Sequence, residues 1–158
     1  MKAEPESRIV KGNDVKFSIS DLKECKTEHW DGVRNYEARN NMKAMKTGDL
    51  CFFYHSNCKV PGIAGLMKVV KEAYPDFTAW DPEHPYYDAK SDKEAPKWFM
   101  VDVEYVGEFG RLIPLKELQG YSELKEMHLV KRGRLSIQPV TSDEFDFIRS
   151  LASLKSEE

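Results

Sequence analysis

The segment from Trp30 to Asn40, which reads Trp-Asp-Gly-Val-Arg-Asn-Tyr-Glu-Ala-Arg-Asn, combines side chains suited to binding a planar polar ligand. Tryptophan offers a large flat apolar surface, and arginine and asparagine can each form two hydrogen bonds with a base edge or a phosphate. A helix that only packs in a core would not use this mixture. Trp30 alone fits a core position or a ligand cage equally well, and the neighbouring Arg34 and Asn35 favour the cage.

Two further aromatic residues, Tyr54 and Trp98, could also stack on a base. Alternation along the β-prone segment that contains Tyr54 places Phe53 and His55 on one face and Phe52 and Tyr54 on the other. One of these faces should be turned toward the core, and the sequence does not decide which. Trp98 follows a Pro-Lys pair at the start of a strand, which favours a core position.

Catalytic and metal-binding patterns are weak in this chain. His55 and Cys58 form a His-x-x-Cys pattern, but a structural zinc site needs four ligands and no second pair lies at a suitable spacing. An ordinary loop thiol is therefore the favoured interpretation of Cys58, and we expect neither a cofactor nor a metal. An enzyme acting on a nucleotide or a small heterocycle remains the alternative, because His55, Ser56 and Cys58 could move protons.

The charge distribution points to a local basic surface rather than to a basic protein. The net charge of −3 argues against a non-specific binder of nucleic acid. One face of the expected helix after Trp30 is basic, and no acid lies between Glu126 and Asp143. The candidate phosphate-binding residues are Arg39, Lys43, Lys131, Arg132 and Arg134. A solvated basic loop is the alternative for the last three.

An acidic stretch from Pro75 to Ala95 supports a different function. It carries six acids against two lysines, without helical or strand periodicity. A long irregular connection in a compact domain is usually functional or mobile. This segment could make the protein an interaction module that docks a basic partner.

The order of expected elements places these residues in one α+β domain. The patterns predict strands at 15–19, 50–55, 63–73, 99–105 and 135–139, and helices from Ser20 to Leu22 and over 35–46, 114–119, 122–127 and from the capping box at 141–144 onward. Regular β-α-β alternation is missing, which favours a curved sheet or a small barrel. We expect a single domain over residues 1–155 and a frayed tail at 156–158.

Composition sets the class of protein. The chain has 158 residues, of which 41% are hydrophobic, enough for one core without disulfides or metals. No run of about eighteen apolar residues is present, so we expect no transmembrane helix and no membrane partner. Three cysteines cannot pair fully, which favours a reducing intracellular compartment. We expect a monomer.

Several words of the sequence, in order, resemble the EVE domain family across nearly the whole chain. They are Lys-Ala-Glu-Pro at 2–5, the segment 30–40, Phe-Tyr-His-Ser at 53–56, Pro-Gly-Ile-Ala-Gly at 61–65, Lys-Glu-Ala-Tyr-Pro-Asp at 71–76, Pro-Lys-Trp at 96–98 and Arg-Leu-Ser-Ile-Gln-Pro at 134–139. The resemblance implies a PUA-like fold, a small mixed β-barrel flanked by helices and related to the YTH domains that read methylated adenine in RNA.

The same resemblance implies a non-enzymatic reader of a modified base. Family members are regarded as readers of modified nucleic-acid bases, with modified cytosine in DNA the leading candidate and RNA the alternative. Such a protein would be nuclear in a eukaryote and cytoplasmic in a bacterium. By motif, the base pocket would be formed by Lys2, Glu4, Trp30, Val33, Arg34, Asn35, Tyr54, His55, Ser56, Leu135 and Ser136. Ala3 stands where the family usually has serine, so one hydroxyl donor is absent.

Overall fold

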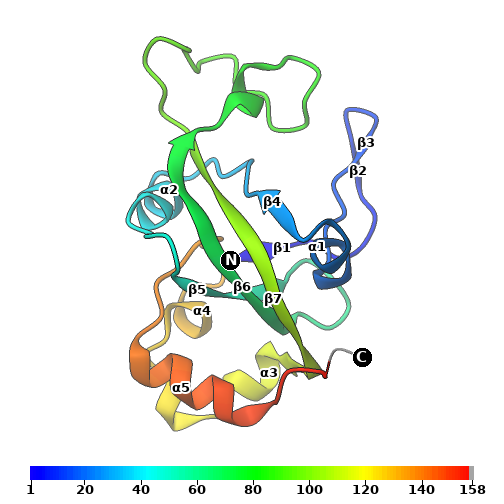
Figure 1. Cartoon of the computed structure of the whole chain (residues 1–158), viewed down its shortest axis with the longest axis vertical. Helices are drawn as coiled ribbons and strands as arrows, with labels where there is room; N and C mark the ends of the chain where they lie inside the picture. The colour runs from blue at the N-terminus through cyan, green and yellow to red at the C-terminus, as the bar shows by residue number, and fades with distance from the viewer. Residues whose placement is uncertain (157–158) are drawn as a thin grey trace.

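Two long antiparallel strands, β6 (Gly62–Pro75) and β7 (Phe99–Pro114), run through the middle of the protein (Figure 1). The computed structural model describes residues 1–156. Strand β5 (Leu50–His55) pairs antiparallel with β6, and β4 (Thr27–His29) pairs antiparallel with β7. The short β1 (Lys2–Ala3) pairs parallel with β5. The result is a five-stranded mixed sheet in the order β1-β5-β6-β7-β4.

This sheet bends strongly but does not close. Of the two forms expected, a curved sheet or a small barrel, the described residues form the open curved sheet, in which β1 and β4 are the two edge strands and do not pair with each other among residues 1–156. The pairing of β6 with β7 shifts register at four places, and the pairing of β5 with β6 shifts once. Each shift is a bulge or irregularity that bends a strand and increases its twist. The bends give the sheet a concave side.

Helical segments cover both faces of the sheet and gather at one end of it (Figure 1). The first face is covered by α1 (Ile19–Cys25) and α2 (Tyr36–Lys43). The second face is covered by α3 (Leu115–Leu118), the 3-10 turn η2 (Ser122–Leu124), α4 (His128–Lys131) and α5 (Ser142–Leu151). No helix within residues 1–156 is long and apolar enough to cross a membrane.

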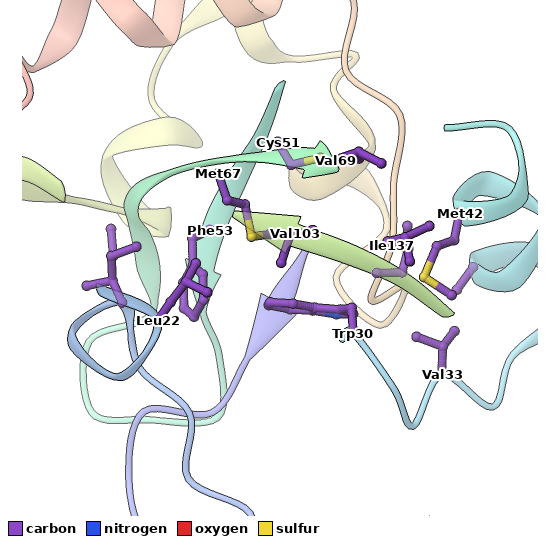
Figure 2. Close-up of a cluster of buried hydrophobic side chains, with 14 of the residues drawn as sticks. Leu22, Trp30, Val33, Met42, Cys51, Phe53, Met67, Val69, Val103 and Ile137 are labelled. Atoms are coloured by element: carbon purple, nitrogen blue, oxygen red, sulfur yellow. The ribbon is translucent and has the colours of Figure 1, made fainter. Parts of the chain in front are cut away.

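Strand β5 is buried on both faces, which is more than the alternation predicted. Phe53 packs in the first hydrophobic cluster, with Trp30 and Met67 (Figure 2). Phe52 and Tyr54 point the other way into the second cluster, which α3 to α5 cover. Both faces are covered, because helices that follow β7 in the chain fold back over the second face. Central strands covered on both sides need apolar residues on both faces.

The helix starts follow local capping chemistry, and they shift two predicted boundaries. The predicted strand at 15–19 and the predicted helix start at Ser20 were wrong. Ser18 caps α1 instead, and its side chain accepts from the backbone N–H of Asp21, whose carboxylate in turn accepts from the N–H of Ser18. Asn35 is the cap of α2, which ends at Lys43, three residues before the predicted end. The capping box Thr141/Glu144 opens α5 as predicted.

The predicted strand at 135–139 was also wrong. This segment is irregular, although Leu135 and Ile137 are buried in the first cluster as the alternation requires. A backbone hydrogen bond joins it to the sheet edge, from the N–H of Lys2 to the carbonyl of Ser136 at 3.1 Å. The helix α4 just before it was not predicted, because four residues are too few to show a period.

The acidic connection between β6 and β7 is organised by its own aspartates. After the 3-10 turn η1 (Phe77–Trp80), it continues without regular structure to Phe99. Four of its carboxylates accept the backbone N–H two residues further along, namely Asp76, Asp81, Asp88 and Asp92. These are Asx turns, in which the side chain replaces a backbone acceptor. The acids predicted to form a docking surface are thus partly engaged in shaping the loop.

A small hairpin not predicted from the sequence projects beside this loop (Figure 1). Its strands are β2 (Ile9–Val10) and β3 (Asn13–Asp14). The turn uses Lys11 and Gly12, both with positive φ, at 50° and 80°. Such two-residue turns match the twist of a hairpin. Lys11 contacts the acidic loop: its Nζ donates a hydrogen bond to the carbonyl of Pro82 and lies over the ring of Tyr87.

Candidate functional site

A cavity of about 940 Å³ lies beside the first hydrophobic cluster, whose Trp30 and Phe17 are part of its lining. Six segments distant in sequence line it: the chain around β1, the β2–β3 hairpin with the residues that follow it, the segment from Glu28 to Asp31, Ser56 and Asn57 after β5, the acidic loop from Asp81 to Tyr86, and the segment from Gly133 to Ser136. Of the predicted base-binding residues, this lining includes Lys2, Glu4, Trp30, Ser56 and Ser136. Its size is within the range of small-molecule sites.

Trp30 forms part of both the core and the cavity wall. Only 7% of the residue is exposed, and its ring meets Phe53 edge-on with centroids 5.5 Å apart. Phe17, which also lines the cavity, meets the same ring edge-on at 6.2 Å. The backbone N–H of Trp30 donates to the backbone carbonyl of Val101 at 2.8 Å. Trp30 is therefore a core residue that also lines the cavity, and its role as part of a ligand cage stays a prediction.

Asp31, the next residue, places a carboxylate in the cavity wall. Its side chain is 22% exposed, and both neighbouring imidazoles lie nearest to Oδ2. His84 Nε2 is 3.5 Å away and His29 Nε2 is 3.8 Å away. Burial raises the pKa of Asp31, and the nearby charge of Asp76 raises it further. Asp31 lies inside the Trp30 motif, but no sequence pattern distinguishes it as a site residue.

A polar cluster that we call the Asp76 clamp fixes the loop after Asp31. Asp76 is fully buried and accepts from the Gly32 N–H and from Arg34 Nη1, each at 2.9 Å. It also accepts the backbone N–H and the hydroxyl of Thr78. Burial alone would raise the pKa of Asp76, but the hydrogen bonds from Thr78, Gly32 and Arg34 outweigh it and leave the pKa below its usual value.

Arg34, which the sequence motif predicted to bind the ligand, is part of the Asp76 clamp. Its Nε and Nη2 donate to the carbonyl of Tyr86 at 3.0 and 2.6 Å. Its guanidinium also lies over the ring of Trp98, 5.8 Å from the centroid. With Asp76 bound as well, Arg34 joins the Trp30 segment to the acidic loop and lies outside the cavity lining.

Gly32 is the close-approach point between these two segments. Its φ is +79°, and a Cβ placed there would lie 2.4 Å from the Tyr86 ring. Only glycine meets both conditions without strain. Tyr86 itself lines the cavity, and its backbone N–H donates to His84 Nδ1 at 3.1 Å. The loop that carries His84 and Tyr86 is thereby held against the Trp30 segment.

The remaining predicted base-binding residues lie outside the cavity lining. Val33 and Leu135 are buried in the first cluster, and the Asn35 side chain caps α2. Tyr54 lies on the opposite face of the sheet, in the second cluster. His55 Nε2 accepts the backbone N–H of Ile19 at 3.2 Å, and burial lowers the pKa of His55.

Polar residues at the N-terminal rim are tied to neighbouring segments. Lys2 Nζ donates to the carbonyl of Gly133 at 2.5 Å, and burial lowers the pKa of Lys2. Glu4 accepts two hydrogen bonds from Arg8 and one from Asn57. Hydrogen bonding from Arg8 is the main reason that the pKa of Glu4 is lowered. These contacts connect β1 to the hairpin and to residues 133–136.

Most of the predicted phosphate-binding residues already have partners. Lys131 pairs with Glu126, and Arg132 pairs with Glu37, which is 95 residues away in sequence. Arg39 donates to the carbonyl of Lys97 at 2.8 Å and lies over the Tyr36 ring. The expected uncompensated basic surface is thus partly neutralised by folding. Lys43 lies over the ring of Phe99, 4.5 Å from its centroid. Arg134 differs, since it is exposed at the cavity rim and has no ion pair within residues 1–156.

The groups considered for catalysis do not form an activated constellation in the described part of the chain. His55 is engaged with a backbone N–H, and the Ser56 hydroxyl donates to the carbonyl of Ala3 at 3.3 Å. Burial raises the pKa of the Cys58 thiol, which lowers its thiolate fraction. Within residues 1–156, no group of three or more His, Cys, Asp or Glu side chains is placed to hold a metal ion.

Comparison with known proteins agrees with this architecture. Residues 1–151 match the EVE domain model. The chain belongs to the EVE domain family. It is 58% identical over 161 residues to thymocyte nuclear protein 1 of Homo sapiens, an alignment that covers 96% of this chain and 72% of that protein. The family predicted from the sequence words is therefore confirmed.

Solved structures show the same fold. A crystal structure of human THYN1 protein in complex with 5-methylcytosine containing DNA matches with a TM-score of 0.94 and 57% identity, over 99% of this chain and 97% of that one. A hypothetical protein from Leishmania major matches with a TM-score of 0.87 and 48% identity, over 96% and 90% of the two chains.

Proposed function

We propose that this protein is a non-enzymatic reader of modified cytosine in DNA, and that the target base leaves the helix and enters the cavity. The observation that carries the proposal is the combination of this cavity with a TM-score of 0.94 to a relative whose structure is in complex with 5-methylcytosine containing DNA. Enzymes that act on a base in a duplex flip it out of the stack into a pocket, and we propose the same movement for this reader. The nucleus is the expected location in a eukaryotic cell, where green fluorescent fusions would test it.

The lining suits a methylated pyrimidine better than it suits a phosphate. Apolar surface comes from Val15, Phe17, Trp30, Pro85 and Tyr86. Polar surface is dominated by acids, six against three cations. The acids are Glu4, Asp14, Glu28, Asp31, Asp81 and Glu83, and the cations are Lys2, Lys16 and Arg134. An acidic cavity repels phosphate and accepts N–H donors, so the base enters and the backbone stays at the rim.

Arg134 is the residue at that rim best placed to contact phosphate. Its side chain is exposed and free of ion pairs within residues 1–156, unlike Lys131 and Arg132. We propose that Arg134 binds the strand next to the extruded base, while Lys131 and Arg132 contribute less because they must first leave Glu126 and Glu37. Phosphate contacts position a protein without reading sequence.

Fluorescence anisotropy tests the proposal. We expect strands with one central 5-methylcytosine to bind more tightly than otherwise identical cytosine strands, in DNA more than in RNA. Arg134→Gln should weaken binding to modified and plain strands alike, and should reduce the slope of log affinity against log salt by roughly 0.7–0.9. Lys116→Gln, an exposed lysine on α3, is the matched control and should change neither quantity.

Three results would contradict this assignment. Equal affinity for modified and plain strands would refute the reader. Loss of modification preference in Arg134→Gln, with an unchanged salt slope, would place Arg134 inside the pocket. A mass change of any modified nucleoside or oligonucleotide incubated with the protein would show an enzyme instead.

A further inference from the structure

Asp31 is the partly buried cavity acid whose hydrogen bonding the described part of the chain leaves incomplete. Of the five other lining acids, Glu83 is exposed and also accepts no hydrogen bond within residues 1–156, whereas the remaining four accept hydrogen bonds from the chain itself. Glu4 accepts from Arg8 and Asn57, Asp14 from Ser7 and the N–H of Lys16, Glu28 from the N–H of His29, and Asp81 from the N–H of Glu83. The carboxylate of Asp31 accepts none within residues 1–156. Its nearest contacts are the long ones to His84 and His29, and both involve Oδ2.

A mostly buried carboxylate that lacks a hydrogen-bond donor from the protein is stabilised when a ligand supplies that donor. Only 22% of the Asp31 side chain is exposed, and this part faces the cavity. Removing an acceptor from water without giving it a partner costs the full desolvation free energy of that group. Because Oδ1 has no partner within residues 1–156, it is the free acceptor for a ligand N–H.

The backbone on both sides of Asp31 is fixed, so the acceptor has a defined position. The N–H of Trp30 is bonded to Val101 in β7, and the N–H of Gly32 is bonded to Asp76. Gly32 also packs directly against the Tyr86 ring. Since His84 Nδ1 accepts from Tyr86, a neutral His84 carries its proton on Nε2, the atom that faces Asp31 Oδ2. That arrangement orients the carboxylate without using Oδ1.

Cytosine and thymine present opposite hydrogen-bonding groups at position 4. Cytosine has an exocyclic amino donor there and thymine has a carbonyl acceptor, while 5-methylcytosine and thymine share the same 5-methyl group. A carboxylate can accept from the amino group and repels the carbonyl oxygen. An acceptor at this point of the wall would therefore separate two bases that the apolar lining alone cannot distinguish.

We propose that Asp31 is the specificity-determining residue of the site and accepts the exocyclic 4-amino group of an extruded pyrimidine. The inference rests on the proposed function. It makes the ligand class amino-bearing, 5-substituted pyrimidines, and it excludes 5-substituted uracils such as thymine. The apolar wall then reads the 5-substituent, and Asp31 reads position 4.

The test uses single strands that differ only in one central base, so that the cost of opening a base pair does not enter. The bases are 5-methylcytosine, cytosine and thymine. We expect the intact protein to bind 5-methylcytosine roughly tenfold more tightly than thymine. Asp31→Asn should bring this ratio close to one, because the amide can turn its NH2 group toward the thymine carbonyl. Asp31→Leu, which removes the acceptor altogether, should also lose the ratio.

The control is Glu24→Gln, which removes one negative charge at an exposed position of α1, outside the cavity lining. It should keep the 5-methylcytosine-to-thymine ratio of the intact protein. Thermal unfolding of each variant checks that the fold is retained. No preference for 5-methylcytosine over cytosine in the intact protein would refute the proposed function. A preference over cytosine together with equal binding of thymine, or full discrimination in both Asp31 variants, would overturn the role of Asp31 alone.

Discussion

Two carboxylates close to Gly32 differ in their hydrogen bonding: Asp76 is at the centre of the Asp76 clamp, and Asp31 is in the cavity wall. Asp76 is fully buried and receives hydrogen bonds from Gly32, Arg34 and Thr78. Asp31 is slightly exposed and receives none within residues 1–156. The pKa of Asp76 is lowered and that of Asp31 is raised. The hydrogen-bond donors of this region therefore bind Asp76, which holds the loop in place, and Asp31 remains available to accept a hydrogen bond from a ligand.

Removing the charge of Asp76 should have the largest effect on stability. Asp76→Asn leaves the Arg34 guanidinium, whose side chain is 21% exposed, without its carboxylate. We expect a loss of about 3 kcal/mol in the free energy of unfolding, as for other buried pairs that lose one partner. Urea unfolding measures it. Asp81→Asn, on the exposed part of the same loop, is the control and should cost less than about 1 kcal/mol.

The pH dependence of this effect follows from the sign of the shift. Because the pKa of folded Asp76 lies below its unfolded value, its contribution is present above the unfolded pKa and is lost as pH falls through the folded one. The difference between the intact protein and Asp76→Asn should therefore shrink in acid. A difference that grows in acid would show that Asp76 is not the stabilised carboxylate.

A substitution at Gly32, between the Asp76 clamp and Asp31, should lower the stability of the fold by an intermediate amount. Gly32→Ala adds left-handed backbone strain, about 1 kcal/mol, and forces the Tyr86 ring away from the added Cβ. Gly12→Ala is a matched control, because its φ of +80° is almost the same and no atom lies within 4 Å of the added Cβ. Thermal unfolding should show Gly32→Ala as the more damaging by at least about 1 kcal/mol. Equal losses would mean that Tyr86 moves freely.

Neutralising Asp31 should have the smallest effect and the opposite sign. A raised pKa means that the protonated carboxyl is favoured in the fold, a stabilisation that is complete below the unfolded pKa and lost as pH rises through the folded one. At pH 7 the ionised group opposes folding. Asp31→Asn should therefore raise the free energy of unfolding by about 1 kcal/mol at neutral pH. In thermal scans this gain should disappear in acid, and a net loss at neutral pH would contradict the comparison.

The site itself was only partly predictable. Trp30, Lys2 and Ser136 reach the cavity as the motifs implied, because each lies in a segment whose neighbours fix its direction. Arg34 was assigned to the ligand because guanidinium groups often bind bases, but its partner Asp76 lies 42 residues away. Asp31 was not predicted. What distinguishes it from other aspartates is the absence of hydrogen-bond donors around its carboxylate, and this depends on distant segments of the chain. No local pattern contains that information.

What the sequence determined by itself is local or repetitive. The caps of α2 and α5 depend on a side chain and an N–H three residues later, and the strands β5 to β7 depend on runs of apolar residues with β propensity. Family membership was equally clear, because many short words occur in order.

The tertiary structure alone decided which charges are free and which faces are covered. Arg132 is neutralised by Glu37 across 95 residues, and Phe52 is buried by helices that follow β7. Those outcomes depend on where the bulged sheet bends and on which distant segments it brings together. Burial and long-range hydrogen-bond partners are properties of the folded chain, whereas capping and periodicity are properties of a few neighbouring residues.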